Sequence, residues 1–333
     1  MTAYLSFLHM SVDFICILTL FHYVSGNATA FILYNFLAFA LQLPFGMILD
    51  ERMSKSNNET KLPLYYVLCG LGLCVIGSLG IYALCGLGNA LFHSGGGVLA
   101  IREDRVCESK GRRLGVFVAP GAFGVTGGIL LGASNKFIIF VVCTVIYMLL
   151  FSYLLYKEEK STNDKQVFIK GAHISKVFVS VFCLLAVILR SIGGITLVYS
   201  WEKTTMLVIL LTVATAFGKA GGGLLAARIG RKKTEIISLC LAAIFYFFSN
   251  EWICALLAVF FFNMTMPLTL QMESDNHFDM PGFAFGLLTF GLFLGYMFQY
   301  YDLVTQVPAS LWGIIFSLAT LILLLLAERV NEE

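Results

Sequence analysis

Hydrophobic residues along this chain gather into long runs, and short polar stretches separate the runs. A helix needs roughly 20 apolar residues to cross a bilayer, at about 1.5 Å of rise per residue. Because such runs fill the chain and leave no soluble domain, the pattern predicts an all-α polytopic membrane protein with 12 transmembrane helices. The 12 predicted spans are residues 4–23, 29–49, 63–79, 81–100, 114–133, 136–156, 177–199, 205–227, 234–249, 251–272, 282–301 and 308–327.

Two stretches of the sequence are similar to each other. Residues 46–55 and 223–232 each combine glycine with basic residues at the end of an apolar run, and they lie 177 residues apart. This offset predicts two pseudo-symmetric six-helix bundles, residues 1–156 and 177–333, joined by a cytoplasmic linker at 157–176. Internal duplication of this kind is typical of secondary transporters.

Composition supports the same class. Of the 333 residues, 59% are hydrophobic and 13% are charged, whereas a soluble domain carries about a quarter charged residues. With the N-terminus inside, the predicted cytoplasmic loops and the C-terminal tail hold 18 of the 22 lysines and arginines. Basic residues are enriched in cytoplasmic loops, so we expect a multi-pass cell membrane protein with both termini in the cytoplasm. The basic residues mark topology and do not indicate a nucleic-acid partner.

The glycine-basic motifs and their positions resemble the major facilitator superfamily. Six spans, a basic linker and six more spans carry the motif after spans 2 and 8, and span 5 has a glycine-proline stretch similar to the one in antiporters of that family. The residues that carry the resemblance are Gly46, Asp50 and Arg52 in the first copy, Gly223, Arg228, Gly230 and Arg231 in the second, and Gly115, Pro120, Gly121 and Gly124 in span 5.

This resemblance implies two bundles that rock around a central cavity between inward-open and outward-open states. It also implies that Asp50 and Arg52 form a cytoplasmic latch, with Arg228 and Arg231 as a weaker counterpart. A carboxylate near a helix N-terminus and an arginine gains charge-assisted hydrogen bonds that break when the bundles part. The alternative for these residues is a charge cluster that only sets topology. The span-5 stretch indicates either antiport or close helix packing. The compactness of the chain and the distribution of the family favour a bacterial inner membrane.

Ionisable residues inside the spans are the main candidates for function. A charge at mid-bilayer costs about 2.5–3.5 kcal/mol on insertion scales, so it faces a cavity or a partner. Asp13 lies in span 1 and Arg190, at the offset of the repeat, in span 7. We expect them to pair in a structural salt bridge or to contact a substrate. His9 lies one helical turn from Asp13, and the two could form a protonation unit; the alternative for His9 is an interfacial position without a role.

Further polar residues are candidate cavity groups. Lys219, opposite Gln42 at the repeat offset, either lines a cavity or extends to the interface. Asn89 and His93 lie one turn apart in span 4 before a glycine run, which is faintly similar to some drug-resistance exporters of the superfamily. Glu273 lies at a predicted membrane boundary, where we expect a solvated loop acid.

Other chemistries find no support. Glycine pairs such as those at 70–72 lie in predicted membrane helices, so they form no nucleotide-binding loop, and no Cys/His spacing indicates a metal site. We expect no cofactor and no enzyme activity. The favoured interpretation is a proton-coupled secondary transporter of a small anionic or zwitterionic solute, with a weak indication of export. We expect it to act as a monomer in the lipid bilayer, with the solute and protons as its partners.

Three alternatives remain open at this stage. The first is a proton-coupled multidrug exporter in which Asp13 binds a lipophilic cation. The second is a non-transporting sensor or scaffold with the same fold, although the charges within the spans argue against it. The third is a membrane enzyme that acts on lipid.

Overall fold

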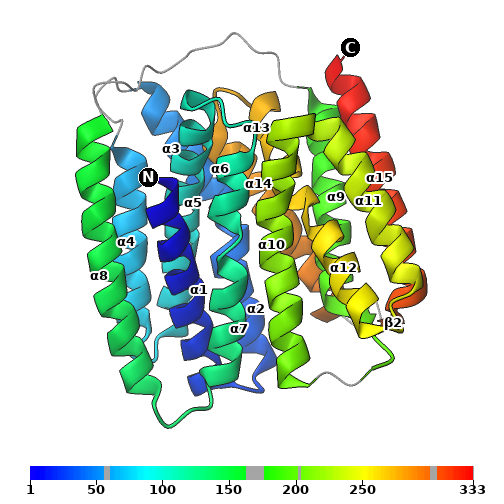
Figure 1. Cartoon of the computed structure of the whole chain (residues 1–333). Helices are drawn as coiled ribbons and strands as arrows, with labels where there is room; N and C mark the ends of the chain where they lie inside the picture. The colour runs from blue at the N-terminus through cyan, green and yellow to red at the C-terminus, as the bar shows by residue number, and fades with distance from the viewer. Residues whose placement is uncertain (56–60, 163–175, 202–203, 301–305, 333) are drawn as a thin grey trace. The chain divides into compact units, whose positions relative to one another are not determined.

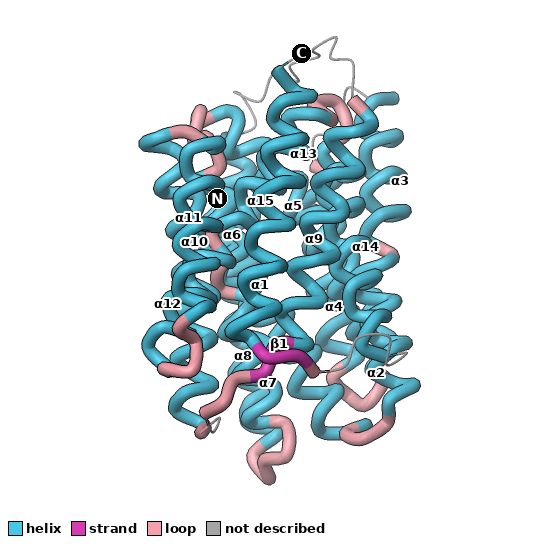
Figure 2. The backbone as a smooth tube through the Cα atoms, turned by 90° about the vertical axis from the view of Figure 1, so that its right-hand side faces the viewer, coloured by secondary structure: helices cyan, strands magenta, loops and turns pink. Residues whose placement is uncertain are grey.

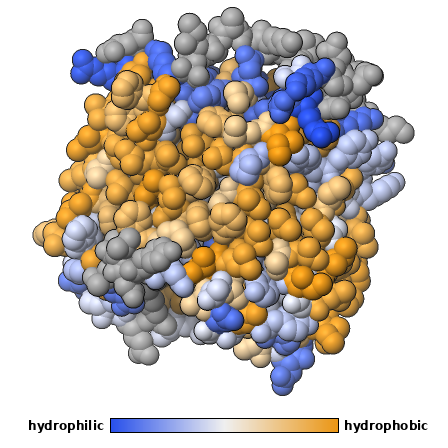
Figure 3. Space-filling view, turned by 180° about the vertical axis from the view of Figure 1, so that it is seen from behind, coloured by the Kyte–Doolittle hydropathy of each residue, from blue (hydrophilic) through white to orange (hydrophobic). Residues whose placement is uncertain are grey.

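The protein is described by a computed structural model that covers residues 1–55, 61–162, 176–201, 204–300 and 306–332. Among the residues that the structure describes, ten helices are long and apolar enough to cross a membrane by length and composition, and residues Leu62–Gly77 form a shorter apolar helix. On the face seen in Figure 3, hydrophobic residues cover most of the middle, and hydrophilic residues gather toward the top and the bottom of the view. The chain is therefore a multi-pass membrane protein. Most of the predicted linker, residues 163–175, lies outside the described residues.

Helices occupy all 12 predicted spans. The helix over the ninth span, Arg231–Phe247, is not among the helices that length and composition mark as membrane-crossing. The exact number of 12 crossings therefore stays a prediction. Three predicted spans are helices with internal breaks, at residues 36–41, 119–120 and 264.

The described chain forms two compact units, and each is considered by itself. Unit 1 comprises Met1–Cys107, Pro120–Ala172 and Asp279–Phe290, and unit 2 comprises Glu108–Ala119, His173–Phe278 and Gly291–Glu333. The division of the chain into bundles at 1–156 and 177–333 stays a prediction.

Unit 1 is built around α1, which packs on α5, α7 and α8. In Figure 1, α1, α4 and α8 lie side by side. The elements of this unit are α1 (Thr2–Val24), α2 (Ala28–Asn35), the π-helix η1 (Phe36–Ala40), α3 (Gln42–Lys55), α4 (Leu62–Gly77), α5 (Tyr82–Val106), α7 (Gly121–Leu131), α8 (Phe137–Thr162) and the first half of α14 (Pro281–Tyr300).

Local sequence sets where these helices begin and how closely they approach. The Asn27 side chain accepts a hydrogen bond from the Ala30 backbone nitrogen at 3.1 Å and so caps α2. α4 and α5 meet through glycines: a Cβ on Gly88 would lie 2.6 Å from the carbonyl oxygen of Gly70. Small residues at such a crossing let membrane helices approach through their backbones.

Unit 2 has a hydrophobic core between α9, α11, α12 and α15. Its two short strands pair in parallel, Leu197 with Val307 and Val198 with Pro308, at one end of the helices (Figure 2). The elements are α6 (Arg112–Val118), α9 (Val177–Thr196), β1 (Leu197–Val198), α10 (Thr205–Ile229), α11 (Arg231–Phe247), α12 (Trp252–Asn263), α13 (Thr265–Asn276), the rest of α14, β2 (Val307–Pro308) and α15 (Ala309–Glu332).

Candidate functional site

In unit 1, α1 and α5 bring two histidines and a carboxylate together. The Nε2 atom of His9 lies 3.1 Å from Oδ2 of Asp13, and the Nε2 atom of His93 lies 3.9 Å from Oδ1 of the same carboxylate. The two imidazole rings meet edge to face, with their centroids 4.5 Å apart. His9 and Asp13 share a face of α1 because they are four residues apart. We call these three residues the His–Asp–His cluster.

Asn89 and the backbone of α5 hold this cluster in place. The Asn89 amide donates a hydrogen bond to Oδ1 of Asp13 at 3.1 Å, and Nδ1 of His93 lies 2.9 Å from the Asn89 carbonyl oxygen. On the opposite side, α7 presents Gly121, where an added Cβ would lie 2.4 Å from Nε2 of His9. Asn89 is 1% exposed and both histidines are 7% exposed, whereas the Asp13 side chain is 13% exposed.

In unit 2, Arg190 lines a small cavity. The cavity has a volume of about 280 Å³, and the polar side chains of Thr215, Tyr199, Tyr246 and Asn263 lie on its wall with Arg190. Arg190 is 9% exposed. Within the described residues, no carboxylate forms an ion pair with its guanidinium group, and no side chain or carbonyl accepts a hydrogen bond from it. Direct pairing of Asp13 with Arg190 stays a prediction.

The other two predicted cavity residues lie elsewhere. Gln42 begins α3 and is 1% exposed; its amide nitrogen donates to the Ala38 carbonyl oxygen at 2.6 Å across the π-helical turn. Lys219 is half-buried in α10. Neither residue is among those that line the Arg190 cavity.

The first motif copy, on α3, contacts the start of α14. Asp50 is 4% exposed, and its carboxylate accepts hydrogen bonds from the Gly282 and Phe283 backbone nitrogens. Gly46 lets α3 touch this helix start, since a Cβ there would lie 2.1 Å from the Gly282 carbonyl oxygen. Arg52 is exposed. Asp50 thus contacts a helix N-terminus, one of the two partners considered from the sequence, and its role as a latch stays a prediction.

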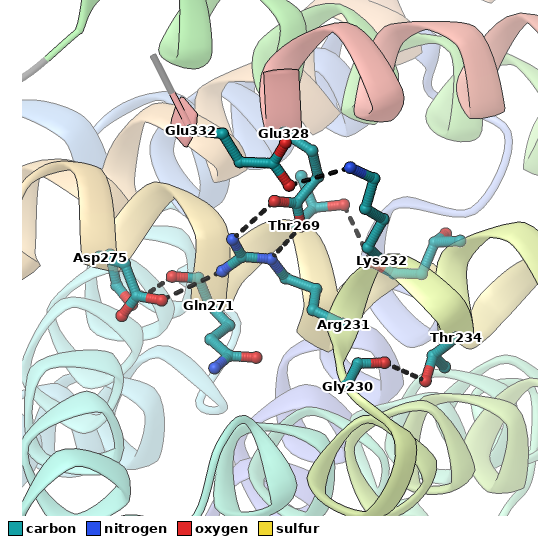
Figure 4. Close-up of polar contacts among 11 residues, drawn as sticks. Gly230, Arg231, Lys232, Thr234, Thr269, Gln271, Asp275, Glu328 and Glu332 are labelled. Atoms are coloured by element: carbon teal, nitrogen blue, oxygen red, sulfur yellow. Dashed lines mark hydrogen bonds and ion pairs between the residues drawn. The ribbon is translucent and has the colours of Figure 1, made fainter. Parts of the chain in front are cut away.

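The second motif copy forms an ion network among three helices of unit 2 (Figure 4). Arg231 contacts Glu328 on α15, with Nε 2.6 Å from Oε1 and Nη2 3.2 Å from Oε2, and its Nη1 lies 3.1 Å from Oδ2 of Asp275 on α13. Lys232 lies 2.9 Å from Glu332. The gating role of this copy stays a prediction.

Arg228, in the second motif copy, is exposed at the end of α10. The remaining glycines of the second copy and of the span-5 stretch lie at close backbone contacts or in a turn. An added Cβ on Gly223 would lie 2.4 Å from the Gly111 carbonyl oxygen, and one on Gly124 would lie 2.3 Å from the Met10 carbonyl oxygen. Gly230 joins α10 to α11 with φ +92°, a conformation that suits glycine.

The span-5 stretch divides at its proline. Pro120 lies between α6 and α7, as expected of a residue that interrupts helical hydrogen bonding. Gly115 on α6 packs on the backbone of α10 in unit 2, with 2.8 Å from an added Cβ to the Lys219 carbonyl oxygen, whereas Gly121 packs on α1 in unit 1. Both glycines make close backbone contacts, and a link of this stretch to antiport stays a prediction.

One sequence-based expectation is wrong, because Glu273 is not a solvated loop acid. It lies in α13 with no exposed surface. Ser180 on α9 donates to its Oε1 at 2.7 Å, and His277 Nε2 lies 3.3 Å from the same atom. The apolar run ends before Glu273, but α13 continues and carries the carboxylate into contact with α9. The i,i+4 spacing of Glu273 and His277 is a sequence signal from which this pair could have been predicted.

The comparisons with known proteins bear on the fold. No family model matches the sequence, and no curated protein matches it. The structure is similar to that of the E. coli fucose:proton symporter FucP, with a TM-score of 0.59 and 12% identity over 98% of this chain and 97% of that chain. A second FucP structure, a major facilitator superfamily transporter in the outward conformation, has a TM-score of 0.60 and 11% identity over 98% of both chains.

A third solved structure with the same fold is a bacterial homologue of the iron transporter ferroportin in an outward-facing state. It has a TM-score of 0.59 and 12% identity over 99% of this chain and 97% of that chain. Taken together, these likenesses show that the chain has the fold of major facilitator superfamily transporters.

Proposed function

We propose that this protein is a secondary active transporter that moves a small anionic solute across the membrane by alternating access. The fold that it shares with solved transporters supports the class. The observation that carries the choice of an anion is Arg190, a buried cation on the wall of a cavity with no carboxylate paired to it among the described residues.

The energetics of burial explain why an anion is expected there. A charged group removed from water is costly unless an opposite charge or strong hydrogen bonds compensate it. The guanidinium group presents a planar set of donors that matches a carboxylate or a phosphate in a bidentate manner. A solute that carries either group would supply the counter-charge that Arg190 otherwise lacks.

The size of the cavity restricts the solute to a small molecule. Pockets for drug-sized ligands occupy roughly 300–1,000 Å³, and the Arg190 cavity holds about 280 Å³. Thr215, Tyr199, Tyr246 and Asn263 supply polar side chains among the residues that line this cavity. A short carboxylate, a small amino acid or a phosphate fits both this volume and these donors.

The remaining parts of the proposal follow from the sequence. Asp13 would take up the coupling proton, the span-5 glycine-proline stretch favours antiport and hence export, and both termini would lie in the cytoplasm of a bacterial cell. The protein would act as a monomer, since each polypeptide contains both halves of the duplicated fold.

A thermal-shift screen of the detergent-purified protein tests the anion. A ligand that binds the native state raises the unfolding temperature by mass action. We expect small carboxylates, zwitterionic amino acids or phosphate to stabilise the wild type, and we expect the shift to vanish in Arg190→Ala. The matched control is Arg228→Ala, because it removes the same charge from an exposed position of the same unit.

Two outcomes would overturn the proposal. If only lipophilic cations such as tetraphenylphosphonium stabilise the protein, the multidrug-exporter alternative replaces it. If an anion stabilises the wild type and Arg190→Ala equally, Arg190 is not the anion-binding residue. An anion that passes the screen is then tested for Arg190-dependent uptake into proteoliposomes, with Arg228→Ala again as the control.

A further inference from the structure

We infer that His9, Asp13 and His93 form a binding site for one divalent first-row transition-metal ion. This inference goes beyond the proposed function and does not need Arg190, which lies in the other unit. It rests on the geometry of the cluster, on the hydrogen bonds behind it and on its charge.

The ligand atoms are already close to metal-binding geometry. One nitrogen from each histidine and one carboxylate oxygen all lie within 4.8 Å of one another. Zinc binds histidine nitrogen and carboxylate oxygen at about 2.0–2.2 Å, which places two ligands of a tetrahedral site roughly 3.3–3.5 Å apart. Each histidine faces a different oxygen of the carboxylate: Nε2 of His9 lies 3.1 Å from Oδ2, and Nε2 of His93 lies 3.9 Å from Oδ1. Since the three ligand atoms lie within 4.8 Å of one another, side-chain shifts of about 1 Å would let all three coordinate one ion.

The hydrogen bond between Nδ1 of His93 and the Asn89 carbonyl oxygen sets the tautomer of the imidazole that a metal ion needs. Nδ1 of His93 lies 2.9 Å from the Asn89 carbonyl oxygen, and a carbonyl oxygen only accepts hydrogen bonds, so Nδ1 carries the proton. In the neutral ring Nε2 then has its lone pair available, and Nε2 is the atom that faces Asp13. Metal-binding histidines commonly donate their second ring nitrogen to a carbonyl or carboxylate in this way.

A second polar group orients the carboxylate. The Asn89 amide donates to Oδ1 of Asp13 at 3.1 Å, while Oδ2 faces His9. The Oδ1 atom of Asn89 is buried and has no hydrogen-bond partner among the described residues. It is an additional oxygen acceptor on the residue that supports both the carboxylate and His93.

The charge of the cluster favours a cation. Two neutral imidazoles and one carboxylate carry a net charge of −1. Within the described residues, Asp13 is joined to His9, His93 and Asn89 and to no lysine or arginine. The elements around it contribute Tyr34 from α2, whose hydroxyl lies 3.4 Å from the Asn89 amide, and Gly121 from α7. The three residues of the cluster thus include one carboxylate and no lysine or arginine.

The donor set selects the class of metal. Imidazole nitrogen suits zinc, iron, cobalt, nickel and copper, whereas magnesium and calcium prefer oxygen ligands. Three protein ligands leave a tetrahedral ion with one coordination position for water or another ligand, unlike the closed sites that hold structural zinc. Such a site is suited to an ion that enters and leaves.

Metal titration of the purified full-length protein tests the inference. The protein is stripped with a chelator and titrated with Zn²⁺ by calorimetry and with Co²⁺ by visible absorption, whose d–d bands report nitrogen and oxygen ligands. We expect one equivalent to bind, with no competition from an equal concentration of Mg²⁺ or Ca²⁺. We expect Asp13→Asn, His9→Gln and His93→Gln each to weaken binding by about tenfold or more, the range in which loss of even a supporting residue falls.

His22→Gln provides the matched control. His22 lies on the same helix but stacks on Phe137, with its Nδ1 3.0 Å from the Gly132 carbonyl oxygen. It should bind zinc as the wild type does, as should Arg190→Ala, whose anion response is tested separately. Size-exclusion profiles and the metal-free unfolding temperature verify that each variant is folded.

Several results would overturn the inference. They are a wild type that binds less than one equivalent, ligand variants that bind as tightly as the wild type, and His22→Gln weakening binding as much as the three substitutions do. If a ligand variant does not fold, the Co²⁺ spectrum of the wild type decides, because a spectrum without histidine–oxygen bands would also exclude the site. Metal binding and the anion response of Arg190 can fail independently, so each result bears on one proposal only.

Discussion

The carboxylate of Asp50 is bonded to the start of α14 through Gly282, although the two residues lie 232 positions apart in the sequence. Oδ1 of Asp50 accepts from the Gly282 nitrogen at 2.9 Å, and Oδ2 accepts from the next nitrogen, that of Phe283, at 2.7 Å. The first N–H groups of a helix have no partner within the helix. A carboxylate there satisfies two of them and also interacts favourably with the helix dipole.

Asp50→Asn should therefore destabilise the protein. An amide has one acceptor oxygen where the carboxylate has two, and it carries no charge, so one N–H loses its partner. Hydrogen bonds to charged groups contribute about 1.5–3 kcal/mol, and we expect a loss of about 2 kcal/mol. Thermal unfolding in detergent measures it. The control is Glu51→Gln, since Glu51 is exposed and its neutral form should unfold as the wild type does; equal effects from both variants would contradict the prediction.

The contact between α3 and α14 depends on Gly46. Gly46→Ala would place a methyl group 2.1 Å from the Gly282 carbonyl oxygen, a backbone atom that cannot move without shifting the helix. We expect a loss of about 1–3 kcal/mol, as for overpacking in a tight core. Gly72→Ala is the matched control, because nothing lies within 4 Å of its added Cβ, and alanine favours helix over glycine by about 0.5–1 kcal/mol. The two variants should shift the unfolding temperature in opposite directions.

Among the charged residues of the unit 2 ion network, Arg231 should be the one whose substitution destabilises the protein most. Its side chain is 15% exposed and that of Glu328 is 7% exposed. Arg231→Ala would leave the Glu328 carboxylate buried without its bidentate partner, and breaking a buried pair on one side costs about 3–5 kcal/mol. Adding Glu328→Gln should recover part of this loss. Lys232→Ala, which removes an exposed pair with Glu332, should change the unfolding temperature little; a larger effect than that of Arg231→Ala would contradict the prediction.

Ser180 should contribute to the stability of the fold because it donates a hydrogen bond to the buried carboxylate of Glu273. Its hydroxyl donates to Oε1 of Glu273 at 2.7 Å and accepts from the Asn276 amide at 3.0 Å. Ser180→Ala would leave both groups without this partner, which costs about 1–3 kcal/mol for a buried polar group. Ser54→Ala, at an exposed position of α3, is the control. If the two serine variants unfold at the same temperature, Ser180 does not stabilise the acid.

The glycine-proline stretch and the basic motifs show which structural features can be predicted from sequence patterns. They indicated helix contacts and charge clusters at the correct positions along the chain, because glycine and proline act on the backbone locally. They did not identify the partners. The family resemblance implied a latch of Asp50 and Arg52, and the partner of Asp50 seen in the described structure is the backbone of α14. Arg231 contacts Glu328 because α11 packs on α15, and the local spacing of residues in the sequence does not predict this contact.

For the candidate sites too, the sequence identified individual residues, whereas helix packing determined which of them come together. Insertion cost makes a charge within a span conspicuous, so Asp13 and Arg190 stand out from composition alone. The i,i+4 spacing also joins His9 to Asp13 before any fold is known. The absence of a short Cys/His spacing, however, argued against metal, because two of the three proposed ligands lie on α1 and the third on α5, 80 residues further along the chain. Metal-site motifs detect ligands that are close in sequence, whereas helix packing brings these together.

The sequence by itself determined that this is a helical membrane protein and where its helices lie. The reason is local: inside a bilayer each backbone N–H and C=O must be satisfied within its own helix, so hydrophobic length alone marks the spans. The tertiary structure decided which side chains meet. His93 reaches Asp13, Glu273 is buried against Ser180 and Asp50 meets α14 only because particular helix faces pack together. Those faces are selected by close contacts between glycines and neighbouring backbones, which the hydrophobic pattern does not encode.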